Sequence, residues 1–176
     1  MHPWRRVAGT AITAALLSRR PPAGVDLWVV PNLNPDGAAS GTRGNAHGVD
    51  LNRNLPWHWR PITGIYDSGP SPLSEPESRI AYRLILRLRP QVSIWFHQHE
   101  DLVDESGGRL AVERRFAELV GLRLARLPRE PGSVISWQNA RLPGTTAFAV
   151  ELPAGRLRGG AARRYAGAVL AVVGPG

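Results

Sequence analysis

The stretch VSIWFH (Val92–His97) joins a short apolar run to a histidine at its end. Its β-branched and aromatic residues, set off by Pro90, predict a buried strand that delivers His97 at its carboxyl end. TTAFAVEL (Thr145–Leu152) has the same character and delivers Glu151. Because functional residues of buried parallel strands gather at the carboxyl ends, these two runs predict both the sheet and its functional edge.

Helical patterns alternate with the strands. One helix is predicted after Ser74, whose spacing to Glu77 is that of a capping box, with Pro76 in its first turn and Pro90 after its end. Its expected apolar face contains Ile80, Leu84, Ile85 and Leu88. The other expected elements are a helix before Ser18, a strand over Val25–Val30, and helices over Ala111–Leu124 and Ala161–Val173. This alternation predicts a mixed, mostly parallel α/β sheet with helices on both faces.

The composition is that of one globular domain over residues 1–176. All 22 basic residues are arginine, against 14 acidic ones, and the net charge is +8. A polyanion partner is one explanation and a base-composition bias of the genome is the other. The arginines are scattered without interleaved aromatic residues, so we expect no nucleic-acid partner. The absence of cysteine excludes disulfides and thiolate metal ligands.

The first 22 residues fit either a signal peptide or a helix. Arg19 and Arg20, followed by two prolines, favour a helix that ends in basic residues over a cleavage site. No apolar run is long enough to span a bilayer, so we expect no membrane partner and favour a cytoplasmic location.

The polar residues at the two strand ends each allow two interpretations. His97 and His99 would share one side of a continuing strand, where they could chelate zinc or form a hydrogen-bonded pair. Glu151 follows small and apolar residues and could be a general base with a raised pKa or half of a buried ion pair.

A long polar loop region lies between Pro31 and Pro72 and contains GVDLNRN (Gly48–Asn54). Loops of this length in compact domains are usually functional or disordered. Arg43 and Arg53 flank or end the polar stretch, and a guanidinium group matches a carboxylate with two parallel hydrogen bonds. The alternative is an ordinary solvated arginine at each position.

Six motifs occur in an order and at spacings that resemble the zinc metallocarboxypeptidase superfamily. They are NLNPDG, TRGN, GVDLNRN, SEPES, WFHQ and FAVELP. Together they look closest to the compact bacterial branch that includes murein peptide amidases. The resemblance runs from about Ala8 to Leu152 and implies the α/β/α sandwich of that family, here without its first strands.

The resemblance also implies roles for individual residues. His97 resembles the third zinc ligand, and Glu151 resembles the general base. Arg43 resembles the arginine that stabilises the oxyanion. Asn52 and Arg53 look like the pair that binds the terminal carboxylate of a substrate. Asp50 is similar to the carboxylate that orients a zinc histidine.

Two positions depart from the family pattern. The H-x-x-E motif that supplies two zinc ligands would fall on Pro3 and Arg6, and His2 is followed at the required interval by Arg5. This predicts a truncated chain or a misplaced start. The HQHE run could offer a metal site through His97 and His99. Arginine and glutamate also stand in LPREPGSVISW where many relatives have a tyrosine over the substrate.

The sequence therefore predicts a zinc-dependent hydrolase fold that cleaves a peptide or isopeptide bond beside a free carboxylate, with murein peptides as candidate substrates. Because the H-x-x-E motif is missing, we expect impaired activity. The alternative hypothesis is a non-catalytic module that binds carboxylate-ended peptides.

Overall fold

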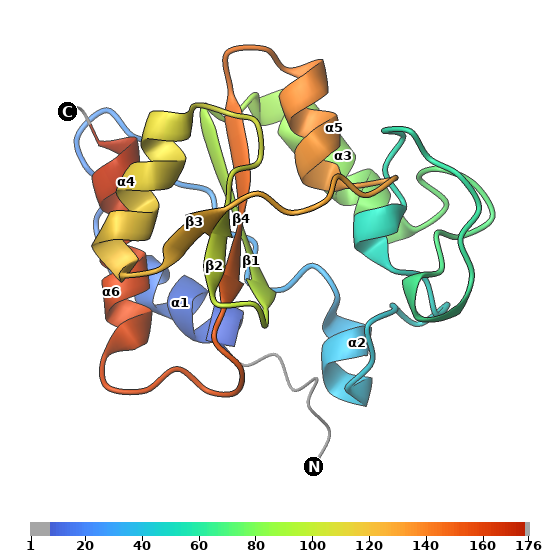
Figure 1. Cartoon of the computed structure of the whole chain (residues 1–176), viewed down its shortest axis with the longest axis horizontal. Helices are drawn as coiled ribbons and strands as arrows, with labels where there is room; N and C mark the ends of the chain where they lie inside the picture. Colours follow the sequence, from blue (N-terminus) through green and yellow to red (C-terminus); the bar gives the residue numbers. More distant parts are fainter. Residues whose placement is uncertain (1–7, 175–176) are drawn as a thin grey trace. The chain divides into compact units, whose positions relative to one another are not determined.

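The computed structural model describes residues 8–174. The chain divides into two compact units, each built from separate segments (Figure 1). The first contains 33–93 and 127–147, and the second contains 8–32, 94–126 and 148–174. The prediction of a single domain over the whole chain stays a prediction.

Four strands form one mixed sheet in the order β1-β4-β2-β3: β1 (Val92–Gln98), β2 (Leu102–Asp104), β3 (Arg123–Ala125) and β4 (Thr146–Leu152). β2 pairs parallel with β3 and antiparallel with β4, where Leu102 lies opposite Glu151. The predicted strands before His97 and Glu151 are confirmed to within one residue, and so is the mixed α/β fold class. His99 lies beyond the end of β1, so the condition under which His97 and His99 would share one side of a strand is not met.

Three helices of the second unit pack around an aromatic core (Figure 1): α1 (Ala8–Leu17), α4 (Leu110–Val120) and α6 (Ala161–Val173). The ring of Phe116 on α4 lies 5.5 Å from Phe148 and 6.5 Å from Tyr165 on α6. All three rings are buried because they fill the space beside the sheet. The predicted closing helix is confirmed at both ends. The helix expected to run to Leu124 ends earlier because Gly121 adopts a left-handed φ of 72° and closes it.

The predicted strand over Val25–Val30 is wrong. This segment has no regular secondary structure, and the side chains of Trp28 and Val30 are 60% and 50% exposed. A run of apolar residues predicts burial only if a neighbouring strand takes up its backbone hydrogen bonds. Within residues 8–174 the structure pairs no strand with this segment.

The first unit contains two longer helices and several short turns. α3 (Pro76–Leu88) and α5 (Val134–Arg141) meet through the rings of Tyr82 and Trp137, whose centroids are 4.7 Å apart. The short helix α2 (Pro35–Ser40) and two 3₁₀ turns, η1 (Leu51–Arg53) and η2 (Gly64–Tyr66), organise the long loop region.

α3 has the expected bounds but neither the expected cap nor the whole expected face. Glu75 is its N-cap residue and makes no capping bond through its side chain, so the predicted capping box of Ser74 and Glu77 is wrong. The Ser74 hydroxyl instead donates to the carboxylate of Glu75, so it does not cap the first turn of the helix. Ile80 is 62% exposed, because the buried face follows Ser78, Ala81 and Ile85.

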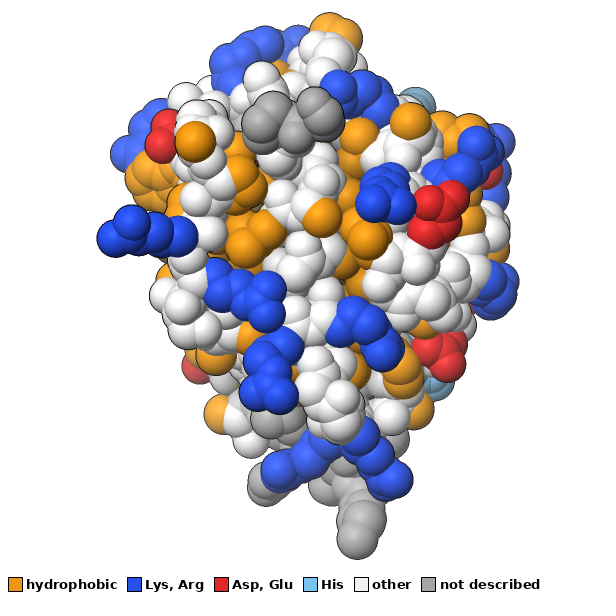
Figure 2. Space-filling view, turned by 90° about the vertical axis from the view of Figure 1, so that its left-hand side faces the viewer, with side chains coloured by type: hydrophobic (Ala, Val, Ile, Leu, Met, Phe, Trp, Pro, Cys, Tyr) orange, Lys and Arg blue, Asp and Glu red, His pale blue; other side chains and the backbone are white. Residues whose placement is uncertain are grey.

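The surface is rich in arginine. Figure 2 shows one face over which blue arginine side chains are spread while acidic side chains are sparse. No helix within residues 8–174 is both long enough and apolar enough to cross a membrane.

Candidate functional site

Asp50 organises the polar stretch in the first unit. Its Oδ2 accepts a hydrogen bond from Arg43 Nε at 2.7 Å, and its Oδ1 accepts from the backbone N–H of Asn52 at 3.1 Å. The second bond caps the 3₁₀ turn Leu51–Arg53. Asp50 is 4% exposed, so its charge is balanced by these partners rather than by water. The predicted orienting carboxylate therefore has an arginine as its observed charged partner.

Arg43 and Arg53 converge on the ring of Tyr66. Their guanidinium carbons lie 4.6 Å and 5.3 Å from the ring centroid, within the range of cation–π attraction. Arg53 is 8% exposed and also donates through Nη1 to the carbonyl of Asn52 at 2.9 Å. The two arginines singled out in the sequence thus share one aromatic platform, which the sequence did not predict.

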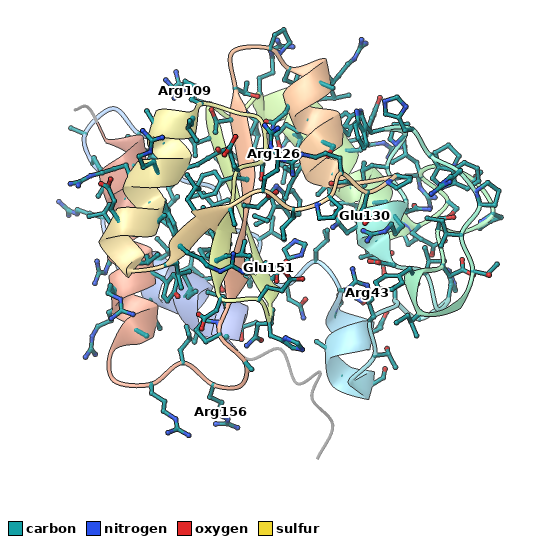
Figure 3. All side chains as sticks on the ribbon, viewed as in Figure 1. Arg43, Arg109, Arg126, Glu130, Glu151 and Arg156 are labelled. Carbon is teal, nitrogen blue, oxygen red and sulfur yellow. The ribbon has the colours of Figure 1, made fainter. Side chains whose placement is uncertain are left out.

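Asn52 and Glu130 complete the surroundings of Arg53. The side-chain oxygen of Asn52 accepts from the backbone N–H of Val134 at the start of α5, at 3.3 Å. Glu130 Oε2 lies 3.7 Å from Arg53 Nη2, and its side chain is 46% exposed. Glu130, labelled with Arg43 in Figure 3, belongs to the segment LPREPGSVISW. The guanidinium group of Arg53 is therefore already beside a carboxylate of its own chain.

An open pocket of about 390 Å³ lies beside Arg43. Small residues form most of its wall: Ser40, Thr42, Gly44, Ala46 and Gly48. Gly44 and Gly48 approach so closely that a Cβ on Gly44 would lie 2.4 Å from the Gly48 carbonyl carbon. The backbone of this loop is therefore packed too tightly for a larger side chain at Gly44.

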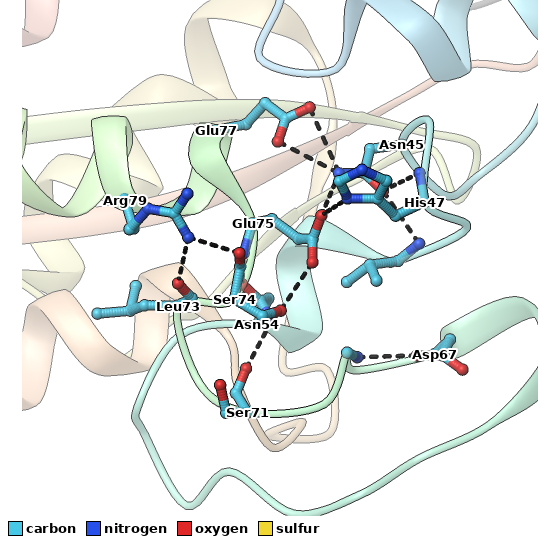
Figure 4. Close-up of polar contacts among 12 residues, drawn as sticks. Asn45, His47, Asn54, Asp67, Ser71, Leu73, Ser74, Glu75, Glu77 and Arg79 are labelled. Atoms are coloured by element: carbon cyan, nitrogen blue, oxygen red, sulfur yellow. Dashed lines mark hydrogen bonds and ion pairs between the residues drawn. The ribbon is translucent and has the colours of Figure 1, made fainter.

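A buried carboxylate that the sequence analysis did not single out lies behind this loop (Figure 4). Glu75 is 3% exposed; its Oε2 accepts from Asn45 Nδ2 at 2.8 Å and lies 2.6 Å from His47 Nδ1. Its Oε1 accepts from the Ser74 hydroxyl, which in turn accepts from Asn54 Nδ2. These five residues are called the Glu75 cluster below. Burial alone would raise the pKa of Glu75, but the bonds from Asn45, Ser74 and His47 outweigh it and lower that pKa.

In the second unit, β1 and β4 bring His97 and Glu151 together. His97 Nδ1 lies 3.6 Å from Glu151 Oε1, and their side chains are 24% and 12% exposed. Gln98 Nε2 donates to the carbonyls of Pro153 and Gly155 at 2.7 and 2.8 Å, which ties the end of β1 to the turn after β4. An imidazole and a carboxylate are thus held side by side at two strand ends.

The second unit also contains a buried glutamate, Glu113, to which the sequence assigns no role. Glu113 in α4 is fully buried, and its Oε1 accepts from the backbone N–H groups of Ser106 and Gly108 at 3.2 and 3.3 Å. Burial raises the pKa of Glu113 despite these two bonds. Its other oxygen has no hydrogen-bond partner among the described residues.

The described residues do not fit a zinc centre. Within residues 8–174 no group of three or more histidine, aspartate or glutamate side chains could hold a metal ion. The metal site that HQHE could have offered is therefore not formed by the described residues. The positions of the predicted H-x-x-E departure, His2, Pro3, Arg5 and Arg6, lie outside the described part of the chain.

Comparison with known proteins agrees with these motifs. Residues 23–104 match the family model described as zinc carboxypeptidase. The chain is similar to the zinc carboxypeptidases over this segment. Murein peptide amidase A of Escherichia coli K12 is 39% identical over 83 residues, which cover 39% of this chain and 34% of that protein. Murein peptide amidase A of Vibrio campbellii is 32% identical over 147 residues, or 71% of this chain and 56% of that protein.

Solved structures of zinc carboxypeptidase relatives share the fold. The crystal structure of murein-tripeptide amidase from Escherichia coli O157 superposes with a TM-score of 0.78 and 26% identity, covering 97% of this chain and 77% of that one. Carboxypeptidase A from Helicoverpa armigera gives a TM-score of 0.70 at 18% identity, covering 96% of this chain and 57% of that one. This chain spans between about a third and just over half of the curated relatives' length.

Proposed function

We propose that this chain is a zinc-carboxypeptidase-like hydrolase module that recognises the free carboxylate of a peptide. The observation that carries the proposal is the joint placement of Arg43 and Arg53 over Tyr66, with Asp50 holding Arg43 through Nε. A guanidinium group held on one edge keeps its other edge for a second anion. The 3.7 Å approach of Glu130 to Arg53 supports the view that a carboxylate suits this place.

The residues of each unit would contribute different chemistry. In the first unit Arg53 and Asn52 would bind a terminal carboxylate, and Arg43 would stabilise negative charge on an oxyanion. In the second unit the carboxylate of Glu151, which lies beside His97, would accept a proton as a general base. Zinc supplies Lewis-acid activation in enzymes of this class. We assign no step through zinc, because residues 8–174 do not form a ligand set.

Murein peptides are the proposed substrate class. The amidases that this chain resembles are named for murein peptides, and such peptides would have to present a free carboxylate to be recognised here. Impaired hydrolysis is part of the proposal, since no complete metal site lies in the described residues. A second candidate function, binding without turnover, is favoured by the same observation.

Two measurements on the full 176-residue chain separate hydrolysis from binding alone. The first is zinc stoichiometry together with release of terminal residues from murein tripeptide. Stoichiometric zinc with fast turnover would overturn the proposed impairment. The second is affinity for a trialanine peptide and for its C-terminal amide, with and without a chelator.

Carboxylate recognition predicts tighter binding of the free peptide than of the amide, even with chelator present. Replacing Arg53 with alanine is expected to abolish this preference, because a charged hydrogen bond contributes about 1.5–3 kcal/mol. Arg60→Ala is the matched control, since Arg60 is an exposed arginine of the same loop region. Equal affinity for the two peptides in the unmodified chain would reject the proposal.

A further inference from the structure

The Glu75 cluster connects both ends of the polar stretch to one buried residue. On one side Asn45 Nδ2 donates to Glu75, and on the other the backbone N–H of Glu75 donates to the side-chain oxygen of Asn54 at 3.2 Å. Asn45 precedes the stretch and Asn54 ends it, directly after Arg53. The charged side chains between them therefore lie on a loop whose two ends share one anchor (Figure 4).

The carboxylate also fixes which way the amide of Asn45 faces. The nitrogen of this amide donates to Glu75 at 2.8 Å and to Glu77 at 3.2 Å, while its oxygen accepts from the backbone N–H groups of His47 and Val49 at 3.0 and 3.1 Å. A flipped amide would point its oxygen at two carboxylates and its nitrogen at two donors. The negative charge of Glu75 therefore selects the orientation that closes the turn.

That turn decides where Arg43 and Asp50 meet. The backbone N–H of Asn45 donates to the carbonyl of Val49 at 2.9 Å, so the chain reverses between these two residues. Arg43 and Asp50 lie just outside the reversal on either side, where they form their 2.7 Å bond. Loss of the turn would separate the carboxylate from the guanidinium group that it orients.

We propose that Glu75 is the positioning residue of carboxylate recognition in this chain. Its carboxylate acts through Asn45 directly and through Ser74 on Asn54, and it does not touch the peptide. His47, whose side chain is 68% exposed, supplies the surface partner of this buried charge through Nδ1. This inference rests on the proposed function, because it explains how the arginines of that function are held.

The test compares Glu75→Gln with the unmodified chain, using trialanine and its C-terminal amide as probes. Glutamine has the same size but no charge, so it weakens the selection of the Asn45 amide orientation and the bond to His47. We expect the preference for the free peptide over the amide to fall at least ~10-fold, because small misplacements of binding groups are costly. Glu77→Gln is the matched control: Glu77 contacts the same Asn45 nitrogen but not His47 or Ser74, and its preference should stay within ~2-fold.

If Glu75 had only a structural role, Glu75→Gln would lower the free energy of unfolding in urea. The folded variant would then still prefer the free peptide over its amide as strongly as the unmodified chain does. An unchanged preference in folded Glu75→Gln, or an equal loss in Glu77→Gln, overturns the inference. If Glu75→Gln does not fold, His47→Ala decides instead, since an exposed side chain can be removed without emptying the core. We expect a loss of ~3-fold there and recovery in His47→Gln, which can still donate to Glu75.

An unchanged preference in His47→Ala would then reject the inference. Failure of the proposed function looks different, because in that case the unmodified chain binds both peptides equally. That result removes both proposals, whereas a clear preference that Glu75→Gln leaves intact removes only this one.

Discussion

The guanidinium groups of Arg43 and Arg53 lie over one ring, 4.6 and 5.3 Å from the centroid of Tyr66. Two cations so close to a common ring repel each other, and the arrangement needs compensation. Asp50 compensates Arg43 directly, the ring contributes its electron-rich face, and Glu130 lies near Arg53. The positive charge is therefore held in place before any peptide binds.

The shared ring leads to a prediction for Tyr66. Tyr66→Ala should weaken binding of the free-carboxylate peptide by about 5–30-fold, since the two cation–π contacts together contribute about 1–2 kcal/mol at an exposed site. Tyr66→Phe keeps the ring and should stay within about 2-fold of the unmodified chain. Titration calorimetry with trialanine measures both. Equal losses in the two variants would assign the effect to the hydroxyl group and contradict a role for the ring in holding the two arginines.

Glu130 is expected to compete with the peptide for Arg53. Glu130→Gln removes the carboxylate 3.7 Å from Arg53 and should raise affinity for the free peptide about 2–5-fold, the range of an exposed ion pair. Affinity for the C-terminal amide should not change. Glu118→Gln, which changes an exposed glutamate of α4, controls for net charge. A gain of the same size in the control would show that only overall charge matters.

Glu113 makes stability depend on pH in a defined direction. Its pKa is raised above the ordinary value of 4.5 by burial, so the folded chain binds more protons than the unfolded chain just above that pH. Stability contributed by protonated Glu113 is therefore lost as pH rises through the folded pKa. Urea unfolding of Glu113→Gln should lack this loss, and the variant should gain on the unmodified chain as the pH rises above 4.5. A constant difference across this range would contradict the assignment.

Gly132 is expected to tolerate no side chain. Its φ is +72°, and an added Cβ would lie 2.0 Å from the carbonyl oxygen of Arg53. Gly132→Ala should therefore cost about 2–4 kcal/mol of unfolding free energy and also disturb binding at Arg53. Gly64→Ala is the control, because Gly64 also has a positive φ but nothing within 4 Å, and about 1 kcal/mol is expected there. Equal costs measured by urea unfolding would reject the steric argument.

Sequence reasoning predicted long elements better than short ones. β1, β4 and α6 were predicted almost to the residue because their apolar patterns are long and bounded. β2 and β3 contain three residues each, too few for a period to be visible, and they were missed. α5 was also missed, although Ser133 caps it by accepting from Ser136 N–H, a local clue in the sequence.

The sequence identified several residues of the candidate site but not the residues that they contact. Arg43, Arg53 and Asp50 were singled out, yet the ring of Tyr66 that joins the arginines was not, since it lies thirteen or more residues away along the chain. The sequence presents Glu75 only as part of the SEPES motif beside a helix start. Its role depends on a hydrogen bond to Asn45, thirty residues away in sequence, and spacing alone carries no information on such a contact.

The double attachment of the polar stretch to Glu75 has a consequence for protein engineering. This internal brace is supplemented from outside the stretch by residues 130–134, where the backbone N–H of Val134 donates to Asn52 and Gly132 packs against the backbone of Arg53. The unit that could be transplanted into another α/β protein is therefore the segment from Thr42 to Glu75 together with residues 130–134. Exchanging it as one block should transfer binding preference, whereas exchanging the arginines alone should not.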